Sequence, residues 1–432
     1  MHLCIKLMKS GRIMKEIQTD VLVLGGGTAG CFAAVAAAKN GAETLIIEKN
    51  GILGGTMTAG RVNFPGLFFA WGKQIISGPC WEAVLRCERR GGAKIPPIAY
   101  CPRNHWEEQI LLDIFTYACV LDELCAESGV KMLLHAMAAQ VEEKNDCIEV
   151  TVAAKEGLFK VKAQVLIDAT GDADGVRLAG YACIKSPVLQ PATLINDIAG
   201  YDIRAVEPEA FEEYVRKAVE QGWLFAEDTQ GGSFYHQLSS GRISMHVSCK
   251  NAETSEGKTE LEISARRTLA RIIGCLKKFH GLEGIFVSSC AVECGVRETC
   301  RIIGEDTVTA EDYLAGKIYE DALCYCFYPI DLHQPTGIKQ IFLQEGRVPT
   351  LPYRAMIPKN AQHILAAGRC ISSDTDANSA IRVQATCMAS GQAAGAAAAI
   401  AAKQKLPVKE ISVEKIRQAL KGIGAIVPYK DF

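Results

Sequence analysis

The sequence lacks a marked excess of charge of either sign and lacks long apolar runs. Its 432 residues carry 47 Lys and Arg against 49 Asp and Glu, so the formal net charge is −2. Because a nucleic-acid-binding domain is usually basic, we expect no nucleic-acid partner. No stretch of about 18 apolar residues occurs, so we expect no membrane span. The hydrophobic content of 49% also excludes the composition of a disordered chain.

The 18 cysteines lack the spacings of common cysteine sites. No pair is spaced C-x-x-C, which argues against a zinc ribbon, a thioredoxin motif and a standard ferredoxin cluster. The first 16 residues carry scattered lysine and arginine but no apolar core of a secretory signal. We therefore expect a cytoplasmic protein whose cysteines are reduced and mostly buried, with no metal site.

A strand–helix–strand pattern begins at residue 20. Residues 20–24 form a short apolar run typical of a buried strand, and an alanine-rich stretch at residues 31–39 predicts a helix. A second apolar run follows at residues 44–47. Between the first run and the helix, residues 25–30 form a G-x-G-x-x-G, which indicates a dinucleotide site in this context.

Residues of this loop have separate physical roles in binding a dinucleotide. Gly25 allows the tight turn, Gly27 lets the backbone approach a pyrophosphate, and Gly30 lets the helix pack close to the strand. Helix N-terminal N–H groups, here beginning at Thr28 and Ala29, attract phosphate. The pattern therefore predicts that the pyrophosphate lies at the start of this helix.

An acidic residue and a second glycine-rich loop follow the second strand. Glu48 lies 18 residues beyond Gly30, where a carboxylate accepts hydrogen bonds from ribose hydroxyls. The E-K-x-x-x-x-G-G segment that begins there contains Lys49, Gly54 and Gly55, followed by Thr56. A nicotinamide dehydrogenase has no need of this second loop, whereas a flavin dinucleotide extends past the first one.

Two later strands also end in glycine-containing turns. Residues 165–168 form an apolar run that leads into an A-T-G-D turn with Ala169, Gly171 and Asp172. It follows segments at 130–140, 147–153 and 159–162, which predict a small β-meander. Near the C-terminus a strand-like run at 362–367 ends in Gly368 and Arg369, and a helix is expected to begin near Ile381 and Arg382.

These segments together resemble the bacterial FAD-dependent oxidoreductase family. The segments that carry the resemblance are G-V-R-E-T-C-R-I at 295–302, A-G-R-C-I-S at 367–372 and G-Q-A-A-G at 391–395. Cys300 stands where the family has arginine, and residues 351–356 vary its proline–tyrosine–arginine segment. Neither departure touches the cofactor loops, so it is the substrate that they leave open.

The resemblance implies an α/β fold and an FAD cofactor. The implied architecture is a Rossmann-like, three-layer FAD/NAD(P)-binding domain of the glutathione-reductase and fumarate-reductase type, with a small β-meander and an inserted α+β substrate domain. FAD is expected to be non-covalent, because the loop at residues 52–60 holds no histidine for a covalent link. The expected divisions are an N-terminal extension at 1–16, FAD-binding parts at 17–185 and 353–405, a substrate domain at 186–352 and a C-terminal tail at 406–432.

Catalytic candidates come from the expected substrate domain. Asp331 and His333 form a D-x-H pair whose side chains point the same way if the segment is a strand, so that the aspartate orients the histidine as a proton acceptor. His246 is an alternative base. Arg297 and Arg301 lie four residues apart, which predicts one face of a helix and either an anion site or structural ion pairs.

Arginine is also a candidate for binding a substrate carboxylate elsewhere in the chain. Arg354 and Arg382 are expected as such clamps, since a guanidinium offers a bidentate fork. The predicted activity is hydride transfer between a small organic substrate and N5 of the flavin. No second G-x-G-x-x-G occurs, so no built-in NAD(P)H domain is expected and a separate electron donor or acceptor stays open.

Two other classes of function stay open alongside this one. The tRNA uridine-modifying flavoproteins share the A-G-R and G-Q-x-x-G pattern, but they require a basic surface and a long C-terminal helical domain. The second alternative is a flavin-binding protein without redox turnover. The sequence leaves the oligomeric state and the direction of the reaction undetermined.

Overall fold

A seven-stranded sheet organises the larger part of the computed structural model, which describes residues 16–98, 105–229, 232–334 and 337–428. Along the main path the strands follow one another as β7 (Lys131–Leu134), β2 (Thr44–Glu48), β1 (Glu16–Leu24), β10 (Gly157–Asp168), β9 (Ile148–Ala154) and β8 (Met137–Glu143), and β20 (Ile364–Ala366) also pairs with β10. The predicted Rossmann-like α/β fold is confirmed.

Strand β10 joins a parallel sheet to an antiparallel one. From Lys160 to its end it runs parallel to β1, whereas on the other edge its first half pairs antiparallel with β9 and its last residues, Leu166 to Asp168, pair parallel with β20. The first half therefore belongs to the small β-meander with β9 and β8. The second half brings the returning C-terminal segment beside the N-terminal strand–helix–strand unit.

Side chains of the parallel strands alternate between two buried cores, as the two-residue period of a strand requires. In β1, Val21 and Val23 contact one apolar core, which includes the helices α1 (Thr28–Lys39) and α10 (Gln384–Gln404). Leu22 and Leu24 contact the other core, together with residues of the meander. A strand that is buried on both faces reads as a continuous apolar run, which is why residues 20–24 show no alternation in sequence.

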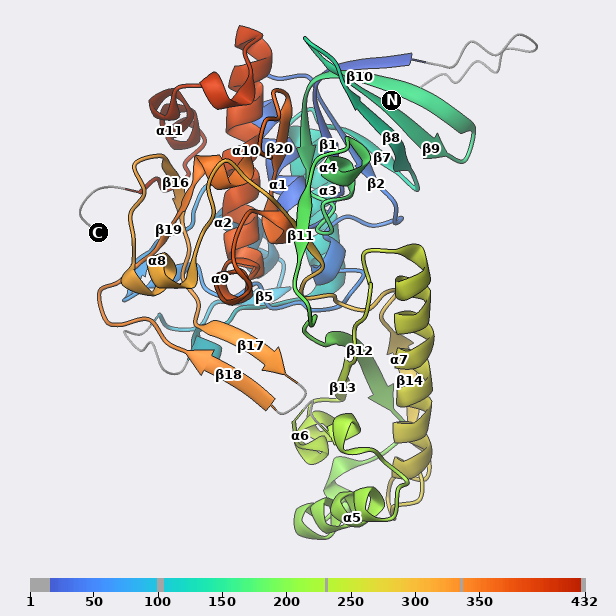
Figure 1. The fold of residues 1–432 in the computed structure, drawn as a ribbon. Helices are drawn as coiled ribbons and strands as arrows, with labels where there is room; N and C mark the ends of the chain where they lie inside the picture. Colours follow the sequence, from blue (N-terminus) through green and yellow to red (C-terminus); the bar gives the residue numbers. More distant parts are fainter. Residues whose placement is uncertain (1–15, 99–104, 230–231, 335–336, 429–432) are drawn as a thin grey trace.

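Helices α1 and α10 pack unusually close together (Figure 1). A Cβ atom on Gly391 would lie 2.1 Å from the carbonyl oxygen of Ala29, and one on Gly395 would lie 2.1 Å from that of Ala33. Only glycine permits this approach. Helices α2 (Pro79–Arg89) and α3 (Ile114–Glu127) complete this side of the sheet.

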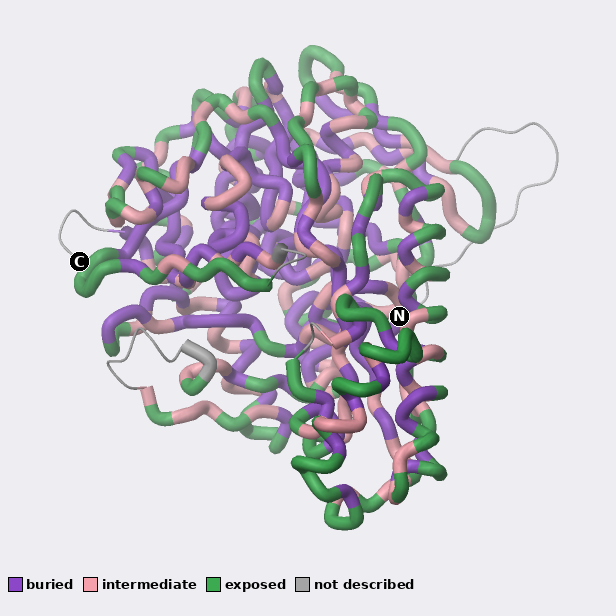
Figure 2. The backbone as a smooth tube through the Cα atoms, turned by 60° about the horizontal axis from the view of Figure 1, so that its bottom comes forward, coloured by how far each residue is buried: buried purple, intermediate pink, exposed green. Residues whose placement is uncertain are grey.

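A smaller lobe contains a separate antiparallel sheet. Its strand order is β13 (Arg242–Val247), β12 (Ala192–Ala199) and β14 (Phe286–Cys290), covered by α5 (Pro208–Glu220), α6 (Phe234–Ser239) and the 22-residue α7 (Ser255–Leu276). These elements share a core of their own, drawn from residues 192–296. Figure 1 shows this lobe projecting from the larger one, and Figure 2 shows that buried backbone is concentrated in the larger lobe.

The core around α1 and α10 and the core of the smaller lobe divide the chain at other positions than the boundaries expected from sequence. Residues 308–351, expected in the substrate domain, contribute to the same core as α1 and α10. They include α8 (Ala310–Ala315), β16 (Ala322–Tyr325), the hairpin of β17 (Ile330–Gln334) and β18 (Gly337–Ile341), and β19 (Thr350–Pro352). The C-terminal segment also joins it, because Ile416 and Leu420 of α11 (Val413–Gly422) are buried there.

Two local predictions are corrected by the structure. The capping-box spacing of Asn104 and Glu107 predicts a helix from residue 104. Helix α3 begins instead at Ile114, because the side chain of Asp113 caps it by accepting a 2.8 Å hydrogen bond from the N–H of Thr116. The predicted cap, Asn104, lies outside the described residues. The single strand expected at 130–140 is two strands, β7 and β8.

Short elements complete the fold. The strands are β3 (Phe69–Ala70), β4 (Lys73–Gln74), β5 (Ala93–Lys94), β6 (Leu111–Leu112), β11 (Cys183–Lys185) and β15 (Cys300–Ile302), and the short α-helices are α4 (Asp174–Leu178) and α9 (Thr375–Ile381). The 3₁₀ turns are at Gly55–Met57, His105–Glu108, Ile203–Ala205, Ala226–Thr229, Tyr353–Met356, Gly368–Cys370 and Val408–Glu410. Within the described residues, every helix is too short or too polar to cross a bilayer.

The close contact of α1 and α10 predicts opposite effects for two helical Gly→Ala substitutions. In Gly395→Ala the new methyl meets the Ala33 carbonyl, so we expect the free energy of unfolding to fall by about 1–3 kcal/mol or more. In Gly274→Ala of α7 the new methyl meets nothing within 4 Å, so we expect the free energy of unfolding to rise by about 0.4–1 kcal/mol. Thermal unfolding midpoints of the FAD-loaded proteins measure both effects, and an equal shift in the two variants would contradict the close packing.

Candidate functional site

A cavity of about 410 Å³ lies where β1, β2 and β10 end. The segments that follow these strands line one side of it, and β12 and β13 of the smaller lobe line the other. In open α/β sheets, ligands bind at the carboxyl ends of the parallel strands. The smaller lobe therefore covers the edge of the sheet where a ligand is expected.

The N-terminus of α1 faces this cavity through the G-x-G-x-x-G loop. Gly27 is the N-cap and gives no side-chain capping hydrogen bond, so the first-turn N–H groups at Thr28 and Ala29 have no side-chain cap. A Cβ on Gly27 would meet only Gly55, at 3.9 Å, whereas a Cβ on Gly30 would lie 1.8 Å from the Gly25 carbonyl oxygen. Open space at the helix start and close packing behind it fit a pyrophosphate bound to backbone N–H groups.

The carboxylate of Glu48 organises the end of β2. One oxygen accepts a 2.7 Å hydrogen bond from the N–H of Gly26, and the other accepts a 2.8 Å bond from the N–H of Asn50. The side chain is buried and lines the cavity. Burial raises the pKa of Glu48, although the two backbone donors oppose this rise. Each oxygen keeps a further lone pair for a ribose hydroxyl.

The buried carboxylate of Asp168 fixes the A-T-G-D turn after β10 through hydrogen bonds. Asp168 accepts hydrogen bonds from the N–H and hydroxyl of Thr170, at 3.0 and 2.7 Å, and from the N–H of Val176 at 2.8 Å. Asp172 then faces the cavity and accepts a 3.0 Å bond from Arg369 and a 2.6 Å bond from the hydroxyl of Thr299. The turn therefore contacts the A-G-R segment through Arg369.

A bridge of charges connects the two lobes beside the first loop. Lys49 lies 2.7 Å from a carboxylate oxygen of Glu293, and Lys258 of α7 lies 3.9 Å from the same oxygen. Burial disfavours the charge of Lys49, but Glu293 outweighs burial and raises the pKa of Lys49. A second cavity of about 920 Å³ adjoins this bridge between the sheet edge and α7. Sequence reasoning missed Glu293 and Lys258, because no local motif places α7 against the second strand.

The N-terminus of α10 lies at the same cavity, beside the N-terminus of α1. Gln384 accepts a 2.9 Å hydrogen bond from the hydroxyl of Thr28 and donates a 2.6 Å bond to the carbonyl of Val62. The helix begins within three residues of the predicted Ile381, after α9 ends. Gln384 thus ties the start of α10 to the start of α1, a link that the sequence did not reveal.

The D-x-H pair lies on strand β17, as predicted. His333 Nε2 lies 3.0 Å from Asp331 Oδ2, and the other carboxylate oxygen accepts a 3.0 Å bond from Gln340 of β18. The buried neighbours Ile330 and Leu332 point into the core, so both polar side chains point into the cavity.

Two further residues from the smaller lobe meet this pair. The ring of His246 lies edge to face with that of His333, with ring centres 5.0 Å apart. Arg297 donates a 3.2 Å hydrogen bond to His246 Nε2 and a 2.5 Å bond to the carbonyl of Pro191. A backbone bond from His333 N to the side chain of Gln190, 3.0 Å long, fixes the strand from the same side.

Burial and the neighbouring cations set the protonation of this cluster. Burial, aided by Arg297, lowers the pKa of His246 to about 3. Burial also lowers the pKa of His333, and the hydrogen bond that His333 donates to Asp331 offsets only part of that decrease. For Asp331, burial is outweighed by the His333 hydrogen bond, which lowers the pKa to about 2. Both histidines are therefore neutral near pH 7, beside an ionised aspartate.

Most predicted site residues line the first cavity. Of the expected cofactor residues all but Gly30, Gly54 and Ile381 do so: Gly25, Gly27, Thr28, Ala29, Glu48, Lys49, Gly55, Thr56, Ala169, Gly171, Asp172, Gly368, Arg369 and Arg382. His333, Asp331 and Arg297 lie at the same cavity. Thr193, Ser244 and Gln384 line it as well, and no sequence motif had singled them out.

The structure does not bring Arg354 or Arg301 to the cavity. The Arg354 side chain is 60% exposed and lies 3.4 Å from Asp321, on a surface turn. The expected helix at 297–301 is absent from the described structure, since a bend precedes β15 at Thr299. Arg301 is instead buried and paired with Glu298 at 3.1 Å. We therefore remove both arginines from the candidate site.

The sheet-edge loops and the two helix N-termini define a dinucleotide-binding flavoprotein with a covering lobe. The sequence matches the FAD dependent oxidoreductase family over residues 20–420, and the chain belongs to that family. It is therefore an FAD-dependent enzyme of the oxidoreductase class, and the open backbone cradle at Gly27 fits that cofactor.

Individual relatives are distant. Digeranylgeranylglycerophospholipid reductase of Picrophilus torridus is 26% identical over 206 residues, 46% of this chain and 49% of the relative. Thiamine thiazole synthase of Methanococcus vannielii is 25% identical over 167 residues, which are 37% of this chain and 58% of the relative. A geranylgeranyl bacteriochlorophyll reductase-like structure from Thermoplasma acidophilum is 16% identical in sequence and has a TM-score of 0.49. The match covers 94% of this chain and 83% of the chain in that structure. The matches span about half to three-fifths of the curated relatives' length.

The position of Glu48 predicts a specific loss of FAD affinity. In Glu48→Ala the charge-assisted acceptor for the ribose is lost, so we expect FAD binding to weaken by about 1–3 kcal/mol. Fluorescence titration of the apoprotein with FAD measures the change. Glu43→Ala, which removes an exposed carboxylate paired with Lys131, is the matched control and should leave the affinity unchanged. Unchanged affinity in Glu48→Ala would contradict the assignment.

Proposed function

We propose that the protein transfers a hydride between a small organic substrate and N5 of FAD, with His333 as the group that moves the proton. The observation that carries the proposal is the Asp331–His333 pair, which lies inside the same cavity as the loops expected to hold FAD. The side chain of His333 is only 11% exposed. An acid–base residue in a flavoenzyme must lie in such a covered cavity rather than on the outer surface.

The hydrogen bonds of His333 define which nitrogen is available. Neutral His333 donates its Nε2 hydrogen to Asp331, which leaves the lone pair of Nδ1. Within the described residues, Nδ1 is buried and has no hydrogen-bond partner. A substrate hydroxyl or C–H acid supplies the partner that this nitrogen lacks. Asp331 keeps the ring in one tautomer and stabilises the imidazolium after proton transfer.

The cofactor and the chain divide the chemistry between them. Bound FAD supplies the hydride acceptor or donor at N5 of its isoalloxazine ring. In the oxidative direction, His333 Nδ1 accepts the proton that accompanies loss of hydride from the substrate carbon. In the reductive direction, the protonated ring returns that proton. Because burial lowers the pKa of His333, the base form is present at pH 7.

We also propose that FAD is bound without a covalent bond. Residues 52–60 hold no histidine that could form the linkage found in covalent relatives. Acid precipitation of the purified holoprotein should therefore release all of the yellow chromophore into the supernatant. Colour that stays with the precipitated protein, measured as flavin absorbance of the redissolved pellet, would contradict this proposal.

Substitution of His333 tests the catalytic proposal. His333→Ala should retain FAD and lower the turnover number by about 10²–10⁴-fold, the usual contribution of a positioned proton-transfer group. Asp331→Asn should lower it by less, because the ring keeps its base nitrogen and loses only its orientation. Flavin absorbance during anaerobic mixing with a substrate library identifies the substrate and then gives the rates.

The pH profile and a matched histidine variant serve as controls. In the wild type, kcat/KM for substrate oxidation should fall as the pH decreases through the pKa of His333, below its ordinary value of 6.5. This inflection should be absent in His333→Ala. His280→Ala, which removes a side chain that is 95% exposed, should behave as wild type. Equal turnover in His333→Ala and His280→Ala would refute the role of His333.

A further inference from the structure

Two arginines meet at the catalytic end of the cavity from different parts of the chain. Arg297 follows the smaller lobe, and Arg382 lies between α9 and α10. The hydrogen-bond acceptors of both guanidinium groups are uncharged. For Arg297 they are the Pro191 carbonyl and His246 Nε2. For Arg382 they are the Asp331 carbonyl, at 3.2 Å, and the side chain of Gln190, at 3.4 Å.

Among the described residues, no carboxylate pairs with either guanidinium group within 4.0 Å. The carboxylates that line the cavity are engaged elsewhere. Asp331 is bound to His333 and Gln340, Asp172 to Arg369 and Thr299, Glu293 to Lys49 and Lys258, and Glu48 to backbone N–H groups.

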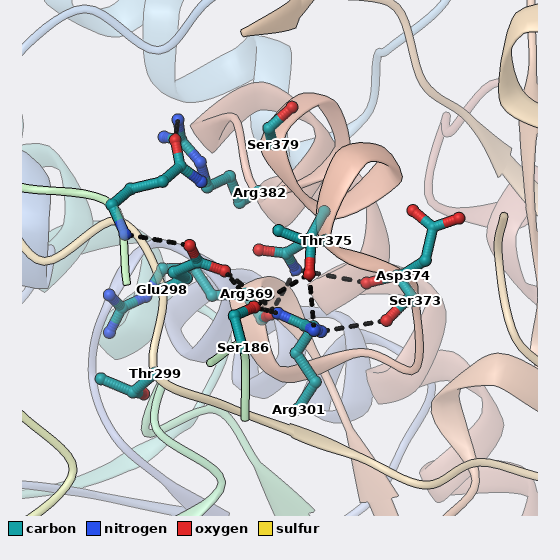
Figure 3. A network of polar contacts seen from close by, with 12 residues as sticks. Ser186, Glu298, Thr299, Arg301, Arg369, Ser373, Asp374, Thr375, Ser379 and Arg382 are labelled. Atoms are coloured by element: carbon teal, nitrogen blue, oxygen red, sulfur yellow. Dashed lines mark hydrogen bonds and ion pairs between the residues drawn. The ribbon is translucent and has the colours of Figure 1, made fainter. Parts of the chain in front are cut away.

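The buried acid Glu298 is also engaged. Glu298 accepts hydrogen bonds from Arg301 at 3.1 Å, from the hydroxyl of Ser186 at 3.0 Å and from the N–H of Gln190 at 3.0 Å. Figure 3 shows these contacts, and none of the dashed contacts of Glu298 runs to Arg382. Arg301 thus has a counter-ion, in contrast to the two arginines at the cavity.

Polar atoms beside the two arginines lack partners too. In the part of the chain that the structure describes, the buried atoms without a hydrogen-bond partner include Arg382 Nε, Gln190 Nε2 and Thr193 Oγ1. The Gln190 and Thr193 residues are only 4% and 6% exposed. Since buried polar groups are nearly always paired, a cluster of unpaired donors around two cations indicates a missing acceptor.

The physical cost of this arrangement points to an anion with two oxygens. A buried cation without a counter-ion is strongly disfavoured, and burial, together with Arg382, lowers the pKa of Arg297 to about 9. A guanidinium group matches a carboxylate through two parallel hydrogen bonds, which are about twice as strong as neutral ones.

We propose that the substrate carries a carboxylate, which binds between Arg297 and Arg382 beside His333. The inference rests on the proposed function, since it identifies the substrate class of the same cavity. The remaining lining near this end includes Val62, Phe64 and Ile338, which fit an apolar body. The substrate class is therefore a small carboxylic acid whose apolar part extends from the arginines along the cavity.

Calorimetric titration of the FAD-loaded protein tests the inference without turnover. The probes are two matched pairs, succinate with succinamide and benzoate with benzamide, in which only the charge-bearing group differs. We expect at least one acid to bind tenfold or more tightly than its amide. Arg297→Gln should weaken binding of that acid by about 10- to 100-fold and leave the amide unchanged. Arg216→Gln, on the exposed face of α5, should leave both affinities unchanged.

Several outcomes would overturn the inference. It is wrong if neither acid is preferred over its amide, or if Arg297→Gln retains the preference. It is also wrong if Arg297→Gln shifts only the flavin reduction potential, because the arginine then serves the cofactor. If Arg297→Gln loses FAD, Thr193→Val tests the same cluster without removing a charge, and an unchanged acid affinity counts against the inference. Loss of turnover in His333→Ala with no acid preference would leave the proposed function intact.

Discussion

The close crossing of α1 and α10 is the constraint on which the cavity depends. Gly391 and Gly395 place one helix against backbone carbonyls of the other, so the two helices lie as close as their backbones allow. Their N-termini open side by side into one cavity. The hydrogen bond from Thr28 to Gln384 joins the two N-termini directly. A dinucleotide in this cavity therefore faces two helix N-termini whose relative position is fixed.

A chain of buried hydrogen bonds carries this rigidity to the catalytic end. Glu298 holds the backbone of Gln190, and the Gln190 side chain in turn accepts from the backbone of His333. Arg301 fixes Glu298 from the other side. The G-x-R-E-T segment thus has two functions in neighbouring residues. Its arginine, Arg297, faces the cavity, whereas its glutamate supports the strand that carries the histidine.

Site residues could be predicted from the sequence where the interactions that position them are local along the chain. The glycine loop could be predicted because its requirements are local. A Cβ atom on Gly30 would lie only 1.8 Å from the Gly25 carbonyl oxygen, so this position requires glycine. The D-x-H pair could be predicted because the period of a strand is local as well. Arg297 and Arg301 were placed on a helix because spacing alone cannot reveal the pairing of β15 with β11, which keeps the chain extended.

Residues contributed by tertiary packing could not be found this way. Glu293 and Lys258 meet Lys49 only because the smaller lobe covers the edge of the sheet, and nothing in the sequence around them encodes that position. Arg354 was misplaced for the opposite reason. Its guanidinium fork made it a candidate carboxylate clamp, but the 3₁₀ turn that contains Arg354 directs the side chain to Asp306 and to the buried Asp321.

The catalytic end separates charge recognition from proton transfer. Burial is the main cause that keeps His246 and His333 neutral, and two cations of the covered cavity add to it: Arg297 disfavours protonation of both rings, and Arg382 disfavours that of His333. The same cations lack counter-ions among the described carboxylates. An anionic substrate would offset their charge and raise the pKa of His333 toward its ordinary value. Binding would therefore prepare the histidine to accept a proton at the moment when the substrate is in place.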